Sequence, residues 1–304
     1  MSITTIAGIA RAAMLVDLNI KVYSGRKQDR KTQAEVTTAK GSGSKRAASV
    51  YKSLFADCKE LDDITKYQAR IRAEHYRLTK PWADNGQRLL PTKLLLEYQG
   101  AMGKCKTEFE FLVDKFVVKY DTLVAAAAFQ LGTLFDRDEY LPGSQIARKF
   151  AIETSFSPLP IAGDFRVDIE SEVQQQLIKQ YEAKSKALLA QSTQDSWTRL
   201  HKVLTNLSDR LVIEEDGTKR KFHDTLVSNA EELCELLDAL NVTADPDLER
   251  ARSKLLDAMT GVTPKELRTE DSTRIETKRK VDAILDAFDW GVEDADADAD
   301  ADAC

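Results

Sequence analysis

The chain has 304 residues, of which 42% are hydrophobic and 31% are charged, and its formal net charge is -6 at pH 7. This length allows one elongated domain or two compact ones, and the 13 glycines and 7 prolines are few enough to expect long elements. No apolar run approaches the ~20 residues of a membrane-spanning helix, and the N-terminus lacks the basic region and clean apolar segment of a signal peptide. We therefore expect a cytoplasmic protein without a membrane partner.

Cysteine and histidine are scattered along the chain. A structural zinc site needs four ligands, usually in close-spaced pairs. The sequence therefore predicts no metal and no cofactor, and it favours free thiols in a reducing cytoplasm. The residues concerned are Cys58, Cys105, Cys234, Cys304, His75, His201 and His223.

The charges are unevenly distributed. Residues 1–52 carry ten Lys or Arg against three acids, whereas residues 289–304 carry seven acids and no base. The tail beyond Trp290 alternates Asp and Ala, cannot bury apolar area and is predicted to be disordered.

The first half of the chain predicts one strand and two long helices. Alternating apolar residues predict a half-buried strand over residues 18–23, followed by a turn and a polar basic stretch. Apolar residues at three- and four-residue spacing then predict helices over about 46–79, ending before Pro81, and about 91–131. Because the connector is short, these helices should fold back as an antiparallel hairpin.

The second half predicts short strands and then more helix. We expect one or two strands within residues 155–169, paired with the strand at 18–23, and a helix from 171 to about 211 with a kink at 191–194. A turn at 214–217 should close a small hairpin. Helices follow near 224–240, 246–259 and 271–288, and Asp245-Pro246 and Thr263-Pro264 are good helix starts.

Together these elements predict a mainly α fold: a long antiparallel helical hairpin plus a small β-sheet, a C-terminal helical part and a disordered acidic tail. We divide the chain into four parts. They are a basic N-terminal segment with one strand (1–45), a long-helix core with the small sheet (46–212), a C-terminal hairpin with helices (213–288) and the acidic tail (289–304).

The connector between the long helices is the segment richest in informative residues. In a structural interpretation, Trp82 closes the hairpin end, Gly86 takes a positive φ, and Asp84 and Arg88 pair or cap a helix. In a functional one, the connector is a contact surface, because exposed Trp and Arg favour binding hot spots. The candidate partner contacts are Trp82, Asp84 and Arg88, together with Trp290 near the tail.

The basic stretch after the first strand is a candidate phosphate-binding surface. Aromatic and basic side chains together suit single-stranded nucleic acid, where stacking and charge both contribute. The alternative is a solvated basic loop, and no RRM, KH or helix-turn-helix signature decides between them. The candidate residues are Tyr23, Arg26, Lys27, Arg30, Lys31, Lys45 and Arg46, and Tyr51 extends the surface.

The acidic tail resembles, in charge only, the tails of phage and bacterial single-strand-binding proteins, which mimic nucleic acid and recruit partners. In that group an aromatic residue commonly ends the tail, whereas here Phe288 and Trp290 precede the acids. The alternative is a solubilising tail.

Sequence motifs of enzymes are missing. The chain has no GxxxxGK[ST], GxGxxG, GxSxG or HExxH, and the acids of residues 245–249 are better read as favouring a helix N-terminus. We therefore predict no catalytic residues and a protein that is not an enzyme. A cluster of His75, Asp84, Arg88 and Asp164 around a pocket would revive the enzyme alternative.

Four short stretches carry a family resemblance. They are Leu18-Asn19-Ile20-x-Val22-Tyr23-x-Gly25-Arg26-Lys27, Pro81-Trp82-x-Asp84, Leu131-Gly132-x-Leu134-Phe135 and Asp164-Phe165-Arg166-Val167. Over roughly residues 14–212 the chain resembles an uncharacterised family of phage and mobile-element proteins, classed only as a domain of unknown function. Its members look like neighbours of CobS/MoxR-type AAA+ ATPases and of recombination or replication genes. The resemblance implies an accessory role in phage DNA metabolism or as an ATPase adaptor, inside an infected bacterial cell, and it supplies no catalytic residues.

Two functions follow as hypotheses. The first is a non-enzymatic helical adaptor or scaffold that forms homo-oligomers, with an AAA+ ATPase as a partner. The alternative is a single-stranded DNA-binding protein whose acidic tail competes for the basic surface.

Overall fold

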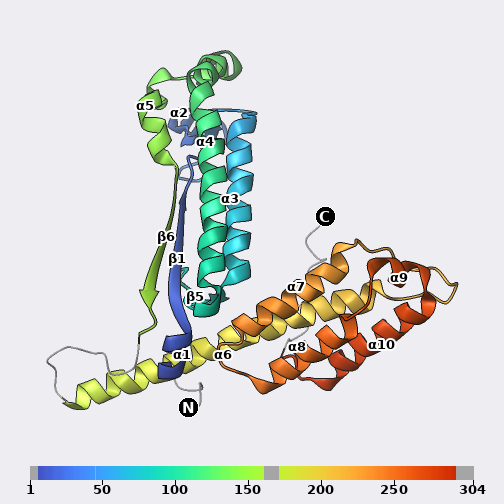
Figure 1. Ribbon diagram of the computed structural model, residues 1–304. Helices are drawn as coiled ribbons and strands as arrows, with labels where there is room; N and C mark the ends of the chain where they lie inside the picture. The colour runs from blue at the N-terminus through green and yellow to red at the C-terminus, as the bar shows by residue number, and fades with distance from the viewer. Residues whose placement is uncertain (1–5, 45, 161–170, 292–304) are drawn as a thin grey trace. The chain divides into compact units, whose positions relative to one another are not determined.

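The computed structural model describes residues 6–44, 46–160 and 171–291, with the helices and strands drawn in Figure 1. The fold is mainly helical with a small sheet, which confirms the predicted fold class. Two compact units are present. Unit 1 contains Met1–Asp17, Arg77–Leu96 and Phe156–Cys304, and unit 2 contains Leu18–Tyr76 and Glu97–Ser155. None of the described helices is long and apolar enough to cross a membrane.

The predicted antiparallel helical hairpin is present in unit 2. It consists of α3 (Lys59–Leu78) and α4 (Leu95–Leu131), which run side by side in Figure 1. Three side-chain contacts join the helices, namely Glu60 with Lys119, Tyr67 with Cys105 and His75 with Tyr98. Since the residue numbers rise along α3 as they fall along α4, the two helices are antiparallel.

The first long helix begins later than predicted. Residues 46–58 contain strand β3 (Tyr51–Ser53) and a turn in which Asp57 has a φ of 56°. Leu54 and Phe55 are buried from this turn, so their spacing mimicked a helical stripe. Helix α3 starts where acidic side chains, which favour a helix N-terminus, enter the sequence.

A short helix in the basic stretch was not predicted. After strand β2 (Arg26–Gln28), helix α2 (Arg30–Ala39) begins at Asp29. The Asp29 carboxylate accepts hydrogen bonds of 3.1 Å from the backbone N–H groups of Lys31 and Thr32. This cap satisfies donors that the first helical turn leaves free.

The core of unit 2 is rich in aromatic rings. Phe55 lies at its centre, with ring centroids 5.4–5.7 Å from those of Phe116, Tyr120 and Tyr140. Short helical turns cover this core after α4, namely η2 (Gly132–Leu134), η3 (Arg137–Glu139), α5 (Gly143–Ile146) and η4 (Ala147–Lys149). The inward face of α4 is therefore anchored in a packed aromatic cluster.

Four strands form the small sheet in the order β4-β5-β1-β6. They are β1 (Ala13–Lys21), β4 (Lys80–Pro81), β5 (Arg88–Pro91) and β6 (Ala151–Pro158). In the antiparallel register of β1 and β5, Ala13 pairs with Pro91 and Val16 with Arg88. Helix α1 (Ile6–Ala12) precedes β1, and turn η1 (Thr92–Leu94) leads from β5 into α4.

The strand predictions were correct in kind and displaced in position. Strand β1 begins before the predicted residues 18–23, because the apolar run at residues 13–16 is buried on both faces and does not alternate. Strand β6 neighbours β1, as expected for the middle segment. The further strand expected near residue 165 and the acidic tail from residue 292 lie outside the described residues.

Unit 1 ends in a helical bundle drawn from yellow to red in Figure 1. Its helices are α6 (Ser171–Arg210), α7 (Thr225–Leu240), α8 (Pro246–Met259), α9 (Pro264–Thr269) and α10 (Asp271–Ala287). Asp245 and Thr263 cap α8 and α9 with their side chains, which confirms the predicted helix starts. α6 stays helical through residues 191–194, and α9 is a short helix that the sequence analysis did not separate.

One buried arginine holds the hairpin between α6 and α7. Arg274 of α10 is 1% exposed, and its guanidinium donates to backbone carbonyls instead of to a carboxylate. The acceptors are the carbonyl oxygens of Arg210, Leu211, Val212, Arg220 and Leu267, at 2.6–3.3 Å. The predicted hairpin is present as a single bridge, Ile213 with Lys219. The hydrogen bonds of Arg274 to the carbonyls on both sides of this bridge hold the hairpin in place.

Replacing Arg274 with Met should lower the free energy of unfolding of unit 1 by about 3 kcal/mol or more, because five carbonyls lose a buried donor. The measurement is urea denaturation followed by tryptophan fluorescence, since Trp82, Trp197 and Trp290 all belong to unit 1. The matched control is Arg279→Met, at an exposed position of the same helix. Equal losses in both variants would contradict this role of Arg274.

Candidate functional site

The candidate nucleic-acid residues lie around a two-stranded ribbon in unit 2. Strands β2 and β3 are antiparallel, with Arg26 opposite Ser53, Lys27 opposite Lys52 and Gln28 opposite Tyr51. Directly opposite residues share a face of the ribbon, and successive residues alternate between faces. Arg26 and Tyr51 therefore lie on one face, and Lys27 lies on the other.

The face with Lys27 contacts an acidic side chain of the same unit, Glu139. The Lys27 ammonium is 3.8 Å from one carboxylate oxygen of Glu139, and the Lys52 ammonium is 2.7 Å from the other. Lys52 also donates to the carbonyl of Leu134. One carboxylate is thus shared by two ammonium groups, and the closer contact belongs to Lys52, so the charge of Lys27 is only partly compensated.

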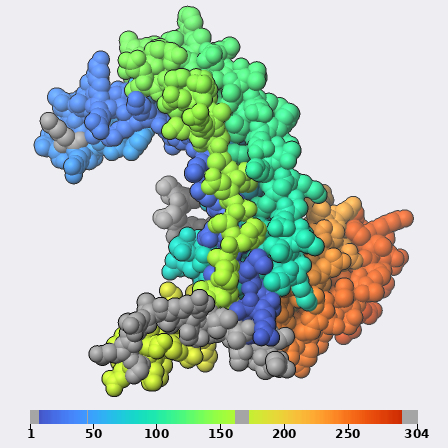
Figure 2. Space-filling model, turned by 60° about the vertical axis from the view of Figure 1, so that its left-hand side comes forward, coloured from blue at the N-terminus to red at the C-terminus, as the bar shows by residue number. Residues whose placement is uncertain are grey.

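The opposite face is basic and aromatic. Tyr51 is 64% exposed, and Arg26, Arg30, Lys31 and Arg46 are exposed as well. The register places Arg26 and Tyr51 on this face, and Arg30, Lys31 and Arg46 belong to the segment between β2 and β3. We call these five residues the ribbon face, and they belong to the blue segments at the upper left of Figure 2. Since Tyr51 pairs in the ribbon next to these bases, it is the aromatic residue available for stacking.

Tyr23, a candidate stacking residue, is only partly exposed. Its ring packs edge-on against Phe55 and Phe150, with centroids 6.3 and 6.5 Å apart. Burial, with the neighbouring Tyr120 and Tyr140, raises the pKa of Tyr23 to about 12. Lys45 lies outside the described residues.

The connector residues mainly serve the fold of unit 1. Trp82 is only 6% exposed and packs in the cluster that contains Ile9 and Leu89, which agrees with the structural interpretation and not with the exposed tryptophan of the functional one. Gly86 has a φ of 92°, as the structural interpretation required. Arg88 Nε donates to the Thr79 hydroxyl at 2.7 Å, and Asp84 is exposed.

Trp290 is likewise anchored. Its ring lies 5.4 Å from that of Trp197, and its indole N–H donates to the Leu285 carbonyl at 2.8 Å. The Trp290 carbonyl accepts a 2.6 Å hydrogen bond from the Gln194 amide. Trp290 therefore fastens the end of α10 to α6, just before the acidic tail.

A different surface, on α4, exposes large apolar side chains. Phe111, Val118 and Phe129 are 51%, 85% and 91% exposed, and Thr122 and Ala125 are exposed beside them. These five residues share one side of the helix, which we call the outer face. Figure 2 shows part of α4 in teal and green. The buried inner side of the same stretch includes Phe109, Val113, Phe116, Tyr120, Val124 and Ala127.

Apolar residues thus occupy both sides of α4 from Val117 to Leu131. A helix on a protein surface normally carries polar side chains toward water. The sequence signal was present, because Phe111 and Val117 already widened the apolar stripe of the second predicted helix. Sequence periodicity does not tell which of these side chains the rest of unit 2 covers.

A buried polar cluster surrounds Lys80 in unit 1. Lys80 is 1% exposed, and its ammonium donates at 3.0 Å to the Leu240 carbonyl at the end of α7. Burial lowers the pKa of Lys80 to about 8, against the opposing attraction of Asp195 and Asp245. Arg199 Nε lies 2.9 Å from Asp195 Oδ2, an ion pair outside hydrogen-bond geometry.

This cluster fixes β4 between α6 and the end of α7. Arg199 donates to the carbonyls of Arg77 and Thr79, both at 2.8 Å, and the Trp197 indole donates to Asp245. Lys80 has an amine of reduced basicity, but its burial leaves no path to a substrate. Its role in this structure is to hold elements together.

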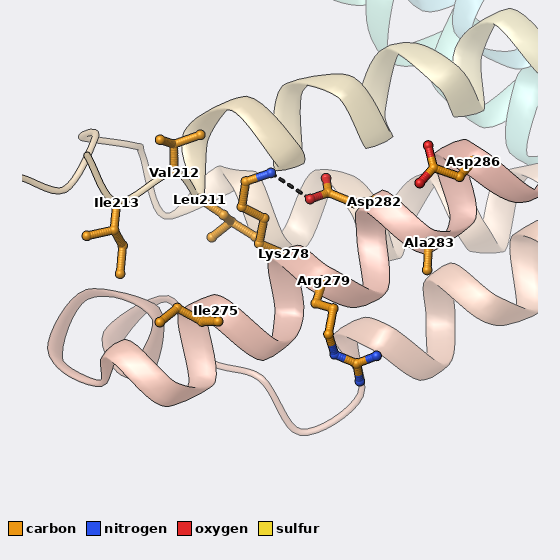
Figure 3. A pocket seen from close by; sticks show the side chains of 9 residues that line it. All are labelled: Leu211, Val212, Ile213, Ile275, Lys278, Arg279, Asp282, Ala283 and Asp286. Atoms are coloured by element: carbon orange, nitrogen blue, oxygen red, sulfur yellow. Dashed lines mark hydrogen bonds and ion pairs between the residues drawn. The ribbon is translucent and has the colours of Figure 1, made fainter. Parts of the chain in front are cut away.

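A pocket of about 540 Å³ lies at the end of the bundle, shown in Figure 3. Ile213 and Ile275 contribute apolar walls, and Lys278 and Asp282 project from α10 as an ion pair of 2.6 Å. Burial alone would raise the pKa of Asp282, but hydrogen bonds from Lys278 and Ser208 lower it overall. Lys278, Asp282 and the Ser208 hydroxyl are hydrogen-bonded to one another.

A metal site and the catalytic cluster of His75, Asp84, Arg88 and Asp164 have little support among the described residues. Within residues 6–44, 46–160 and 171–291, no group of three or more His, Cys, Asp or Glu side chains is placed to hold a metal ion. His75 is buried against Tyr98, and Asp164 lies outside the described residues. The structure thus offers two surfaces for binding, the ribbon face and the outer face of α4.

Comparison with known proteins finds no matching family model, no matching curated protein and no matching solved structure. The resemblance to the phage and mobile-element family therefore stays a prediction.

The contribution of Lys80 to the free energy of unfolding of unit 1 should rise with pH above about pH 8. The pKa of Lys80 is about 8 in the folded chain against an ordinary 10.5, so the folded chain releases this proton first as the pH rises. The stabilising contribution is complete above pH 10.5 and is lost as the pH falls through 8. The measurement is urea denaturation by tryptophan fluorescence between these pH values.

Lys80→Met is the variant that isolates this effect, because Met fills a similar volume without a charge. The difference between the wild type and this variant cancels the titration of tyrosines and cysteines. Lys202→Met, at an exposed position of α6, serves as the control. If the profiles of wild type and Lys80→Met run parallel, the proposed burial of this charge is wrong.

Proposed function

We propose that this chain is a non-enzymatic helical adaptor or scaffold protein of phage or mobile-element origin. It self-associates and serves DNA metabolism in the bacterial cytoplasm. The observation that carries the proposal is the outer face of α4, where Val118 and Phe129 are 85% and 91% exposed. The apolar character of both sides of this helix favours a second partner on the outside.

The energetics support association through this face. Burying a Val or Phe side chain fully is worth about 1.5–3 kcal/mol, and apolar patches of this kind on soluble proteins mark interaction sites. The scaffold interpretation also suits the lengths of α3, α4 and α6, which have 20, 37 and 40 residues. An AAA+ ATPase, as the family resemblance implies, is the proposed client of the assembled scaffold.

The wild-type chain should self-associate reversibly, and Phe129→Glu should weaken this association at least tenfold, because a charge would replace an apolar contact. Sedimentation velocity over a wide range of concentrations measures the effect. The matched control is Gln99→Glu, at an exposed α4 position away from the outer face. A wild type that stays monomeric at every concentration would overturn the scaffold proposal.

A second candidate function is binding of single-stranded DNA through the ribbon face. The specific observation is an exposed Tyr51 on a ribbon that also carries Arg26, with Arg30 and Lys31 at the adjoining start of α2. Base stacking on an aromatic ring and backbone contacts from basic side chains are the two interactions that such binding combines.

Replacing Arg26, Arg30 and Lys31 together with Ala should reduce the slope of log affinity against log salt by about 2, because about 0.7 counterion per phosphate contact is no longer released. Tyr51→Ala should cost about 1–3 kcal/mol of binding and leave that slope unchanged. Fluorescence anisotropy with labelled oligothymidine measures both. The control replaces Lys179, Lys184 and Lys186, which are exposed on α6. An equal loss in this control would point to nonspecific charge.

The acidic tail should compete with DNA for the ribbon face. A chain that ends at Gly291 keeps the anchoring of Trp290 and loses the acids of residues 292–304, so it should bind oligothymidine more tightly than the full chain. A full-length variant with Asn and Gln in place of those acids should behave like the shortened chain. Unchanged affinity in both forms would contradict competition by the tail.

A further inference from the structure

We propose that Glu139 is a positioning residue for the ribbon face. It holds two lysines on one side of the β2-β3 ribbon and thereby keeps Tyr51 and Arg26 on the other side, available to single-stranded DNA. This inference rests on the proposed binding of single-stranded DNA, and it adds how the rest of unit 2 builds the surface that binds.

The ribbon is too short to fix its own register. Strands β2 and β3 have three residues each, and no side chain of either strand is buried. An isolated two-stranded ribbon is at best marginally stable in water. Backbone hydrogen bonds from Asp29 to Val50 and from Leu54 to Gly25 close the ribbon at its two ends. Its register therefore depends on contacts with the rest of unit 2.

Two lysines lie directly opposite each other in the ribbon. Lys27 pairs with Lys52, so their side chains share a face, and like charges directly opposite destabilise a strand pair. The Glu139 carboxylate offsets this repulsion, because one of its oxygens lies 2.7 Å from the Lys52 ammonium and the other lies 3.8 Å from the Lys27 ammonium. One acidic side chain thus contacts both strands.

The contact with Lys52 is the stronger of the two. The side chains of Lys52 and Glu139 are 10% and 14% exposed, so salt and water screen their attraction less than they screen a pair on the open surface. The Lys52 ammonium also donates to the Leu134 carbonyl at 2.7 Å. The neighbouring Tyr140 hydroxyl donates to the Leu54 carbonyl at 2.8 Å. The segment that carries Glu139 is therefore fastened to β3 and to the residue that follows it.

The position of Lys52 decides where Tyr51 points. Successive residues of a strand project to opposite faces, so a Lys52 held by Glu139 leaves Tyr51 on the far face, where it is 64% exposed. Arg26 shares that face. A slip of one residue in the register would turn the side chains of a strand to the opposite face. Stacking on Tyr51 beside a basic side chain therefore requires the register that Glu139 supports.

Hydrogen exchange in the full chain, followed by NMR, tests this role without DNA. Glu139→Gln removes the carboxylate paired with Lys52, so the backbone amides of Asp29 and Leu54 should exchange about tenfold faster than in the wild type. Adding Lys52→Met removes the charge left behind and should restore most of the protection. The matched control is Asp138→Asn, which removes the same charge at an exposed neighbouring position and should leave the exchange unchanged. Unchanged exchange in Glu139→Gln would overturn the positioning role.

The affinity for labelled oligothymidine, measured by fluorescence anisotropy, tests whether Glu139 acts through Tyr51. Glu139→Gln should weaken binding about fivefold although it makes the chain more basic, whereas Asp138→Asn should bind at least as tightly as the wild type. In a Tyr51→Ala background, Glu139→Gln should cause no further loss, because both substitutions remove the same stacking contact.

Tighter binding by Glu139→Gln would overturn the positioning role, and so would an equal further loss in the Tyr51→Ala background. A wild type that binds no oligothymidine would overturn the DNA-binding function itself. Exchange of the Asp29 and Leu54 amides would then still decide whether Glu139 holds the ribbon in register.

Discussion

The packing of the inner side of α4 decides which of its side chains face water. Phe116 and Tyr120 join the aromatic cluster around Phe55, and contacts with α3 such as Lys119 with Glu60 fix the rotation of the helix. Because an α-helix turns by 3.6 residues, this rotation places Val118 and Phe129 outside. The exposed apolar surface is thus a direct consequence of the packed interior. This surface lowers the solubility of the chain, and a partner on the outer face would remove that cost.

The buried charges of unit 1 have structural partners. Arg274 donates to five carbonyl oxygens around the hairpin after α6, and the Lys80 ammonium donates to the end of α7. Burying such groups is costly unless hydrogen bonds compensate. These residues stabilise joints between elements, which is consistent with a protein whose role lies on its surface.

Periodicity predicted the long helices, the short connector predicted the hairpin, and cap residues before proline predicted the helix starts at Asp245 and Thr263, because those signals are local. It misplaced the start of α3, since Leu54 and Phe55 are buried from a turn that mimics helical spacing. It named both Tyr23 and Tyr51 for the basic surface without distinguishing their exposure, and it left open whether Trp82 closes the hairpin end or is exposed. Burial of an aromatic ring depends on partners distant in sequence, such as Phe150 for Tyr23 and Ile9 for Trp82. Neither the sequence signal nor its spacing contains that information.

The account is tested most directly by photo-cross-linking from the outer face. p-Benzoylphenylalanine in place of Phe129, which is 91% exposed, should yield a covalent dimer on irradiation. Mass spectrometry should locate its cross-link on the outer face of α4 in the second copy. Cross-links confined to a single chain, or located away from α4 of the second copy, at concentrations where the wild type associates would contradict the proposed role of α4.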